Sequence, residues 1–320
     1  MIIKEDVYKK AFEAKKNALR EKQTLREAAS AAAYNAEPRL TEIDRSLSSI
    51  GASLAIAALS GADVTNLKKR SEALSREKKV LLDKFGVRDI KYDCPLCSDT
   101  GYVNGRICGC VKHLVAAFIA EEMSEEMPLS TSRFDNFDLK YYPDKDTKDG
   151  NPRRIMTKLF KTCYEYAFEF DPKTSGNLLF MGGVGLGKTH LTLAMVGKII
   201  EKGFVPVYGS AENLFSQIEK EKFTDGNRGA YDAMIKSDLL VIDDLGAEMA
   251  TPFSKSALYN LVNTRLLANR PMIINTNLTI KEIEARYTPR ISSRLIGNFD
   301  TDKFIGTDIR QQRAVEKMSK

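Results

Sequence analysis

Residues 177–203 read NLLFMGGVGLGKTHLTLAMVGKIIEKG, and this stretch decides the fold. The apolar run Asn177–Met181 predicts a short buried strand, and the residues after Lys188 have the spacing of a helix. Between them, residues 182–189 match G-x-x-x-x-G-K-[ST] at every fixed position. Strand, glycine loop and helix in this order are the context of a Walker A motif. The stretch therefore predicts an α/β fold with a P-loop and a parallel sheet.

The glycine loop predicts a site for ATP and Mg²⁺. Its backbone N–H groups can surround phosphates at a helix N-terminus, Lys188 supplies a point charge to the β- and γ-phosphates, and the Thr189 hydroxyl ligates magnesium. A glycine turn without a nucleotide is the alternative, and chance would produce this pattern in roughly 1% of chains of this length. We expect the nucleotide to contact Gly182, Gly183, Val184, Gly185, Leu186, Gly187, Lys188, Thr189, His190 and Asp243.

Two carboxylates follow a second apolar run. Residues 238–246 predict a continuous, fully buried strand that ends in two carboxylates, Asp243 and Asp244. Acids at the tip of such a strand indicate a metal ion or a water molecule there. We expect Asp243 to hold magnesium and Asp244 to polarise the attacking water as the general base of an ATPase. The alternative is that both acids only cap a following helix.

A third buried strand is predicted at 271–274, and Asn275-Thr276-Asn277 follows it. In a parallel sheet this end lies beside the phosphate loop, where an amide can orient the attacking water next to Asp244. We favour Asn277 over Asn275 for this role. Alternatively, both asparagines only make the turn before a helix that starts near Thr279.

Arginines near the C-terminus are candidates to reach a nucleotide. Arg286, Arg290 and Arg294 are four apart, so one helix covering them would align all three on one face. Like charges at this spacing repel each other, and an anion such as the γ-phosphate of a neighbouring subunit would relieve the repulsion. A solvated face, or one that meets nucleic acid, is the alternative. Arg310 is a further candidate.

Four of the five cysteines lie in CPLCSDTGYVNGRICGC at 94–110. The C-x2-C and C-x-C pairs, with glycines in the connecting turns, bring Cys94, Cys97, Cys108 and Cys110 within tetrahedral reach of one zinc ion. Four thiolate ligands leave no open position, so we expect a structural role. His113 could replace one cysteine, although we expect it to be exposed, and Cys163 is interpreted as a core residue.

The first ninety residues predict a helical hairpin or short coiled coil. Apolar residues recur at helical spacing over 7–32, which predicts a first helix. Pro38 suits the first turn of a second helix that runs to about residue 58, and Gly61 is a predicted break. Leucines seven apart then predict a third helix that ends at Gly86. Such an arm either binds a partner helix or only packs on the rest of the chain. Residues 126–152 predict a linker, and Phe134 and Phe137 before its charged part either pack or line a ligand pocket.

Composition limits the remaining possibilities. The chain has 320 residues, of which 43% are hydrophobic and 29% charged, so two or three structural units are expected. The net charge of +6 divides into +5 for 1–90, −4 for 91–150 and +5 for 151–320. An immediately charged start and the lack of a long apolar run argue against a secretory signal and a membrane span. Together with clustered cysteines, this predicts a cytoplasmic protein.

In combination, SRFDNFD, GKTHL, VIDDLG and NTNL make residues 134–313 resemble AAA+ ATPases, and more closely the bacterial helicase loaders of the DnaC/DnaI type and their IstB-like relatives. The cysteine element also looks like the module that precedes the ATPase core in some members. The resemblance implies four regions: a helicase-binding arm at 1–90, a zinc module at 91–125, the linker at 126–152, and an AAA+ core at 153–320. Only thirty residues follow Arg290, so no full C-terminal lid is expected.

The resemblance also implies roles for single residues. Lys188 and Thr189 would be the Walker A pair, Asp243 the Walker B ligand, Asp244 the catalytic acid and Asn277 the first sensor. Arg290 would be the arginine finger that acts on a neighbouring subunit, and Arg310 a sensor-like arginine. Asp244 departs from the family pattern, because many AAA+ proteins carry glutamate there, and the shorter arm suggests slow hydrolysis.

The implied function is an ATP-controlled loader that self-associates, binds the hexameric replicative DNA helicase and delivers it to single-stranded DNA. A mixed basic and aromatic segment suits such DNA, although an ordinary amphipathic helix explains it as well: Phe215, Lys220, Lys222, Phe223 and Arg228. One alternative function is an IstB-like transposition helper that acts with a transposase on duplex DNA. Another is an ATP-binding adaptor with negligible turnover.

Overall fold

A computed structural model describes residues 4–60, 63–124, 131–222 and 229–318. Contacts divide the chain into two compact units: Phe12–Cys108, and Gly109–Lys320 together with the N-terminal residues up to Ala11. The division falls inside the predicted zinc module, directly after Cys108. Among the residues described, no helix has both the length and the apolar character needed to cross a membrane.

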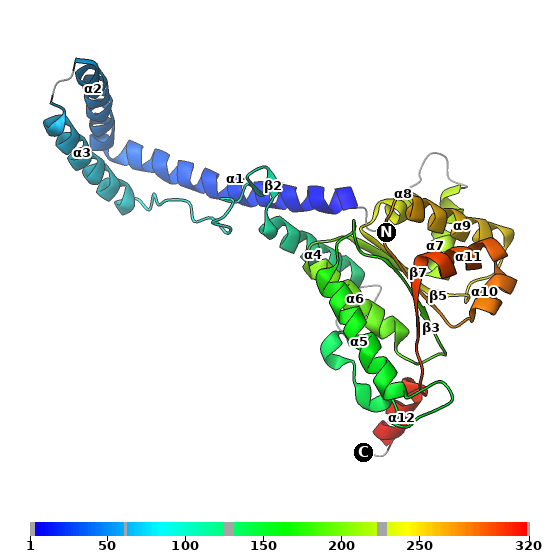
Figure 1. Cartoon of the computed structure of the whole chain (residues 1–320). Coiled ribbons are helices and arrows are strands. Elements are labelled where there is room, and N and C mark those ends of the chain that lie inside the picture. The colour runs from blue at the N-terminus through cyan, green and yellow to red at the C-terminus, as the bar shows by residue number, and fades with distance from the viewer. Residues whose placement is uncertain (1–3, 61–62, 125–130, 223–228, 319–320) are drawn as a thin grey trace. The chain divides into compact units, whose positions relative to one another are not determined.

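The larger unit contains a parallel sheet of five strands, which confirms the predicted α/β fold (Figure 1). Its strands lie in the order β4-β5-β6-β3-β7, and all neighbours are parallel. The bounds are β3 (Asn177–Met181), β4 (Pro206–Ser210), β5 (Leu239–Leu245), β6 (Met272–Thr276) and β7 (Phe299–Lys303). Because β3, β5 and β6 are adjacent and parallel, their carboxyl ends meet at one edge of the sheet.

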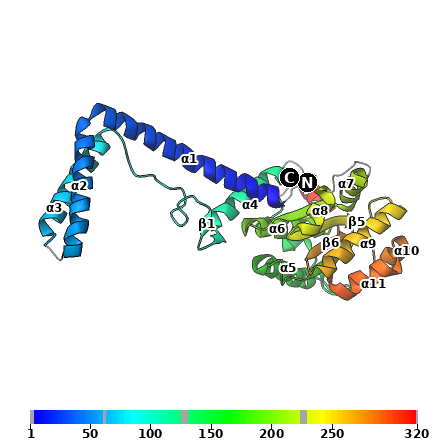
Figure 2. The same ribbon diagram turned by 90° about the horizontal axis from the view of Figure 1, so that it is seen from above.

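Helices cover both faces of this sheet, as Figures 1 and 2 show from two directions. On one side lie α4 (Gly109–Ser124), α5 (Pro152–Glu169) and α6 (Lys188–Glu201). On the other side lie α7 (Ala211–Lys222), α8 (Gly229–Lys236), α9 (Pro252–Leu267), α10 (Ile280–Arg286) and α11 (Pro289–Asn298). The short turns η2 (Phe134–Asn136) and η3 (Leu139–Tyr141) precede α5, and α12 (Ile309–Met318) follows β7.

Strand alternation explains why β5 carries both core and site residues. Leu240 and Ile242 are fully buried in the cluster formed with α7, α8 and α9. Val241 and Asp243 point to the opposite face, because successive side chains alternate across a strand. The sheet therefore buries one set of β5 side chains in the core and directs the other set toward α6.

A buried arginine closes the amino-terminal side of the same core. Arg265 of α9 has no exposed surface. Its guanidinium donates to the backbone carbonyls of Met234, Ile235, Ser237 and Pro271. A buried cation is costly unless several acceptors bind it, so these hydrogen bonds explain how the Arg265 guanidinium can lie in the core.

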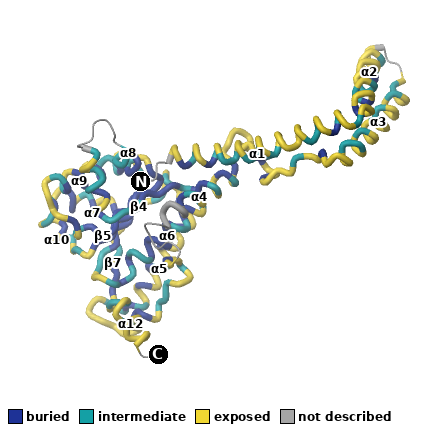
Figure 3. The backbone as a smooth tube through the Cα atoms, turned by 180° about the vertical axis from the view of Figure 1, so that it is seen from behind, coloured by how far each residue is buried: buried dark blue, intermediate teal, exposed yellow. Residues whose placement is uncertain are grey.

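The unit Phe12–Cys108 contains most of α1 (Lys4–Ala36), then α2 (Pro38–Ser60), α3 (Thr65–Lys84) and the antiparallel pair β1 (Tyr102–Val103) and β2 (Arg106–Ile107). Pro38 opens α2 as the sequence predicts, and Gly61 lies outside the described residues. Exposed residues predominate along α2 and α3 in Figure 3, and α3 has no buried residue. Ion pairs connect these two helices, with 2.5 Å between Lys78 Nζ and Asp44 Oδ1.

Candidate functional site

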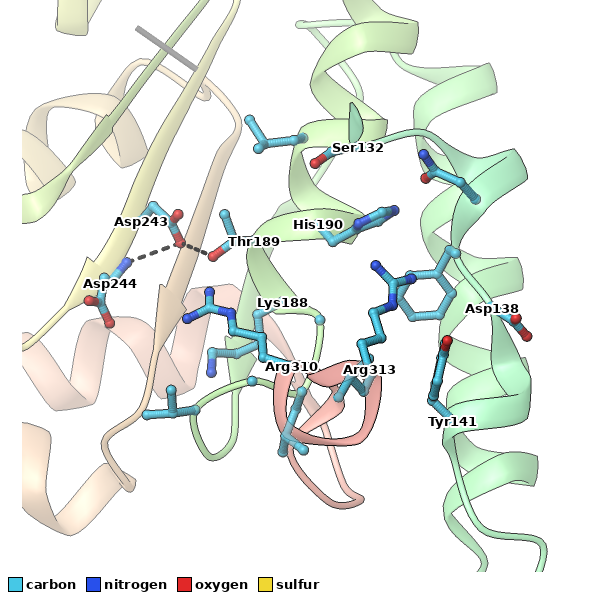
Figure 4. Close-up of a pocket in the computed structure, with 18 of the residues that line it drawn as sticks. Ser132, Asp138, Tyr141, Lys188, Thr189, His190, Asp243, Asp244, Arg310 and Arg313 are labelled. Atoms are coloured by element: carbon cyan, nitrogen blue, oxygen red, sulfur yellow. Dashed lines mark hydrogen bonds between the residues drawn. The ribbon is translucent and has the colours of Figure 1, made fainter. Parts of the chain in front are cut away.

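A cavity of about 570 Å³ lies at the carboxyl edge of the sheet (Figure 4). The phosphate loop, the ends of β5 and β6, the start of α12 and residues 132–142 supply its walls. Eleven of the predicted site residues line it: Val184, Gly185, Leu186, Gly187, Lys188, Thr189, His190, Asp243, Asp244, Asn277 and Arg310. The sheet order explains this convergence, because β3 lies beside β6, and β6 lies beside β5.

The phosphate loop connects β3 to α6, and two other segments hold it in place. Gly185 has φ +74°, and a Cβ there would approach a carboxylate oxygen of Asp308 to 2.1 Å. The backbone N–H of Ile309 donates to the Gly185 carbonyl at 2.9 Å. From the other side, the Tyr142 hydroxyl donates to the Leu186 carbonyl at 2.8 Å. Glycine at 185 is thus required by the close approach of the β7–α12 connection as well as by its backbone conformation.

Lys188 begins α6 and is 7% exposed. Its Nζ donates to the carbonyls of Gly182 and Gly183 at 2.7 and 2.8 Å, and to Asn277 Oδ1 at 2.6 Å. Asn277 Nδ2 in turn donates to Asp244 Oδ1 at 2.9 Å. Burial lowers the pKa of Lys188, while the carboxylates of Asp244 and Asp243 oppose that shift. Asn277 therefore connects the cation of the phosphate loop to the second carboxylate.

Asp243 is 7% exposed and accepts hydrogen bonds at both carboxylate oxygens. Thr189 Oγ1 and Asn275 Nδ2 donate to its Oδ1 at 3.2 and 2.7 Å. The Tyr208 hydroxyl donates to its Oδ2. Burial and the nearby Asp243 raise the pKa of Tyr208, so this hydroxyl stays protonated as a donor. A hydroxyl and a carboxylate side by side are the oxygen ligands that Mg²⁺ prefers, so these residues fit that ion.

Asp244 differs from its neighbour in exposure and in backbone conformation. It is exposed, it lines the cavity, and it has φ +54°. The pairing of β5 with β6 changes register between Ile242 and Leu245, so Asp244 lies at a bulge. A bulge re-aims a side chain, and here it lets two consecutive carboxylates reach the same cavity.

Two arginines of α12 line the cavity. Arg310 was a candidate from the sequence, and its positive charge contributes to lowering the pKa of Lys188. Arg313 was not, although it lies one helical turn further on; its guanidinium is 5.1 Å from the centre of the Tyr141 ring. In Figure 4 the Arg310 guanidinium extends toward Lys188 of the phosphate loop, whereas the Arg313 guanidinium extends toward His190. The (i, i+3) spacing in IRQQR was the available signal.

Aromatic side chains from the segment before α5 form another wall. Phe137 lines the cavity, and its ring stacks on Tyr142 and Phe160 at 5.8 and 5.6 Å. Phe134 packs edge-on against Phe160 and Tyr164 of α5. Packing and pocket lining were the two alternatives for Phe134 and Phe137, and Phe137 does both. His190 also lines the cavity, and burial lowers its pKa.

The prediction of one helix carrying Arg286, Arg290 and Arg294 is wrong. Arg286 ends α10 and donates to the Glu248 carbonyl. Thr288 and Pro289 then cap and open α11, which carries the other two arginines. Arg290 is exposed, while Arg294 Nε donates to Asn263 Oδ1 at 3.0 Å. Neither Arg290 nor Arg294 lines the cavity within this chain.

The segment suggested for single-stranded DNA is only partly described. Phe215 on α7 is 4% exposed and belongs to the core, so it does not offer its ring to a base. Lys220 is exposed. Phe223, Arg228 and the side chain of Lys222 lie outside the described residues. The position of Phe215 favours the amphipathic-helix interpretation for the described part of this segment.

The sulfur atoms of Cys94, Cys97, Cys108 and Cys110 all lie within 4.8 Å of one another. The first three cysteines are buried and the fourth is partly buried. Four converging thiols fit a tetrahedral zinc site, because thiolate is a preferred ligand of that ion. His113 is exposed and is not one of this group, and Cys163 is fully buried in α5.

A buried carboxylate organises the loop that carries the first two cysteines. Asp99 is 2% exposed and accepts from the backbone N–H groups of Asp93 and Cys94 at 2.8 and 2.9 Å. Lys15 of α1 donates to it at 2.9 Å. Burial alone would raise the pKa of Asp99, but these hydrogen bonds outweigh it and hold the pKa well below its usual range. Asp99 is not among the residues predicted from the sequence.

The fold and the cavity together define a P-loop nucleotide-binding unit of the AAA+ class. Residues 136–292 match the family model described as IstB-like ATP binding protein. This part of the chain is therefore similar to the IstB-like ATP-binding family, as its motifs indicate.

Three relatives are each 26% identical. One is the phage-like element PBSX protein XkdC of Bacillus subtilis, matched over 63% of this chain and 78% of the relative. Another is the replicative helicase loader DnaC of Escherichia coli K12, over 42% and 56%. A putative ATP-binding protein of insertion sequence IS5376 from Geobacillus stearothermophilus matches over 46% and 53%. The chain thus spans about half the length of the last two relatives.

Solved structures match part of the chain at low identity. The crystal structure of the DnaC helicase loader is 20% identical with a TM-score of 0.46, covering 54% of this chain and 98% of that chain. The crystal structure of DnaI is 19% identical with a TM-score of 0.45, covering 57% and 93%.

Proposed function

We propose that this protein is an ATP-switched loader that places the replicative DNA helicase on single-stranded DNA. The observation that carries the ATPase part is the convergence of Lys188, Thr189, Asp243, Asp244 and Asn277 in one cavity. The family match and the DnaC relative support the loader part. Such a role implies a cytoplasmic location.

In this proposal, each residue of the cavity has a distinct task. Lys188 binds the β- and γ-phosphates, and Thr189 and Asp243 hold Mg²⁺, which neutralises phosphate charge when bound. Asp244 accepts a proton from the attacking water, which Asn277 orients through its amide. Asn277 bonds to both Lys188 and Asp244. A γ-phosphate that draws Lys188 away from Asn277 would therefore also change the hydrogen bond to the general base.

Arginines would complete the site from two directions. Arg310 approaches the phosphates from α12 of the same chain, whose N-terminus bonds to the phosphate loop. Arg290, exposed on α11, would reach the nucleotide of a neighbouring subunit. The proposal therefore requires self-association through the AAA+ interface. Mixing Arg290→Ala protein with Lys188→Ala protein tests this, because only mixed neighbours would regain hydrolysis.

We further propose that the arm at 1–90 binds the hexameric helicase and that the four cysteines hold a structural zinc ion. The converging sulfur atoms support the zinc site. The apolar residues Ile56 and Leu59 near the end of α2 are 68% and 91% exposed, which suits contact with a partner helix.

Lys188→Ala tests the ATPase assignment. Loss of the charge-assisted bonds to phosphate should weaken ATP binding about 100-fold, measured with a fluorescent ATP analogue. Lys198→Ala is the matched control, because Lys198 lies on the same helix and pairs with Glu201 at the surface. Normal ATP binding by the Lys188 variant would contradict the proposal.

A transposition helper acting with a transposase on duplex DNA is the second candidate. The IS5376 protein supports it, because that relative is as similar to this chain as DnaC is. Pull-down of the full chain with the replicative helicase and, separately, with a transposase distinguishes the two. We expect micromolar or tighter binding to the helicase only; binding to the transposase alone would favour the helper.

A further inference from the structure

Tyr208 lies outside the walls of the cavity but touches one of its carboxylates. It stands in the middle of β4, where it pairs with Val241 of β5, and Ser210 pairs with Asp243. Residues two apart point to the same face of a sheet, so the Tyr208 side chain lies on the face that carries Asp243. Its hydroxyl donates a hydrogen bond to Asp243 Oδ2.

We propose that Tyr208 is a positioning residue for Asp243, which sets how tightly the site takes up Mg²⁺ with its nucleotide. This inference rests on the proposed ATPase site. Rotation about the last side-chain bond of an aspartate is only weakly restricted, so its carboxylate needs outside groups to fix its plane. Asn275, Thr189 and the backbone N–H of Asp244 donate to Oδ1, whereas Tyr208 is the donor to Oδ2.

The hydrogen bond from Tyr208 affects how the carboxylate of Asp243 is oriented. With Oδ2 held by a protonated phenol, Oδ1 remains beside the Thr189 hydroxyl, 3.2 Å away. Asp243 and Thr189 are the residues that would hold Mg²⁺ in the proposed site. Without the phenol, Oδ2 loses its donor in a site that is 7% exposed, and the carboxylate gains freedom to turn. Hydrogen bonds to metal-ligating groups typically change metal affinity about 10- to 100-fold.

Tyrosine suits this task because its ring is rigid and its hydroxyl can reach Asp243 on the neighbouring strand β5. The ring is anchored in the strand, so the hydroxyl position is defined by few rotatable bonds. A simpler role is that Asp243 only satisfies the buried hydroxyl of Tyr208. The two roles predict different results when that oxygen is removed.

The test is Tyr208→Phe in the full-length protein, with a fluorescent ATP analogue titrated in EDTA and over a range of Mg²⁺ concentrations. We expect the Mg²⁺ concentration that gives half-maximal enhancement of binding to rise about tenfold, with Mg²⁺-free affinity unchanged within about twofold. Tyr166→Phe is the control, because it removes a hydroxyl that donates to the Gly176 carbonyl at 2.8 Å, outside the cavity. Thermal unfolding of both variants checks their folding.

Three outcomes decide the matter. An unchanged Mg²⁺ dependence in Tyr208→Phe overturns the inference, and so does equal weakening of binding with and without Mg²⁺. Because coupled residues are non-additive, adding Tyr208→Phe to Asp243→Asn should produce no further shift in Mg²⁺ dependence, and a further tenfold shift would also overturn it. If wild-type protein binds no ATP analogue, the proposed function itself fails, and that result is visible before any variant is compared.

Discussion

The two units of the chain differ in what holds their backbones in place. In Gly109–Lys320, β5 and β6 bury Leu240, Ile242 and Ile274 completely, and helices cover both faces of the sheet. In the described part of Phe12–Cys108, a small cluster around buried Ala33, Leu40 and Val87 connects the helices, and no residue of α3 is fully buried. Polar contacts such as those of Asp99 and Asp44 therefore matter more in the smaller unit.

This difference teaches how each unit can carry a ligand site. Apolar burial contributes about 25 cal/mol per Å², so the sheet can hold a polar cavity in shape by itself. Exposed ion pairs contribute about 0–1 kcal/mol each, so the smaller unit has little to hold its three cysteines, Cys94, Cys97 and Cys108, in place. We therefore expect a nucleotide site that is preformed and a cysteine site that depends on its metal.

Removal of the metal site should have the largest effect. Cys94→Ser combined with Cys97→Ser should reduce bound zinc from about one ion per chain to about none, because two of the four thiolate ligands are removed. The module should then unfold locally, since structural zinc contributes about 10–16 kcal/mol to the folding of small modules. Metal analysis and limited proteolysis around residues 94–110 measure the loss. Nucleotide affinity should stay within about twofold if the larger unit holds its own cavity.

Cys163→Ala is the matched control for that experiment, since this cysteine is buried in α5 and is not part of the cluster. It should leave the zinc content unchanged. Loss of ATP binding in the double serine variant would contradict the independence of the two sites.

Asp244→Asn should remove function from the preformed site without removing stability. Asparagine keeps the shape of the side chain and accepts the bond from Asn277, but it cannot take a proton. We expect hydrolysis to fall about 10²- to 10⁴-fold, with ATP binding nearly unchanged. A phosphate-release assay measures the rate, and Asp232→Asn, at an exposed ion pair of α8, is the control. A rate within about threefold of wild type would exclude Asp244 as the general base.

Asp44→Asn should have the smallest effect and shows how the smaller unit is held. Burial alone would raise the pKa of Asp44, but hydrogen bonds from Lys78 and Tyr34 outweigh it and lower the pKa. A lowered carboxyl pKa stabilises the fold above the usual value of about 3.8. That stability is lost as the pH falls through the lowered pKa.

At pH 7 we therefore expect the α2–α3 pair to lose about 0.5 kcal/mol of local stability in this variant, measured by hydrogen exchange. Asp83→Asn changes an exposed carboxylate of α3 and is the control. The difference between the Asp44 variant and wild type should shrink toward pH 3. A difference that grows on acidification would contradict this account.

Much of the larger unit can be predicted from the sequence, because its signals are local. The strand before the glycine loop, the acid pair near the end of β5 and the asparagines at the end of β6 each stand next to an apolar run. Their meeting follows from one rule, that carboxyl ends of parallel strands share an edge. The family resemblance rests on the same motifs.

Other features depend on pairing between distant segments, which no single stretch reveals. Tyr208 looks like an ordinary strand residue until β4 is aligned with β5 so that Ser210 faces Asp243. Gly185 looks like a phosphate-loop glycine, yet its neighbour Asp308 arrives from β7 and α12. The break between α10 and α11 could have been predicted from the sequence, because Thr288-Pro289 is a helix-start signal. The regular spacing of the arginines pointed instead to one continuous helix.

The left-handed backbone at Asp244 bears on how this protein family can diversify. Aspartate and asparagine tolerate positive φ, whereas most other residues pay about 1 kcal/mol or more for it. The glutamate that many AAA+ proteins carry would gain reach here only by accepting that strain at φ +54°. Glutamate at position 244 would therefore be better tolerated if the β5 bulge changed with it, so exchanges at this position should be coupled to the backbone of the bulge.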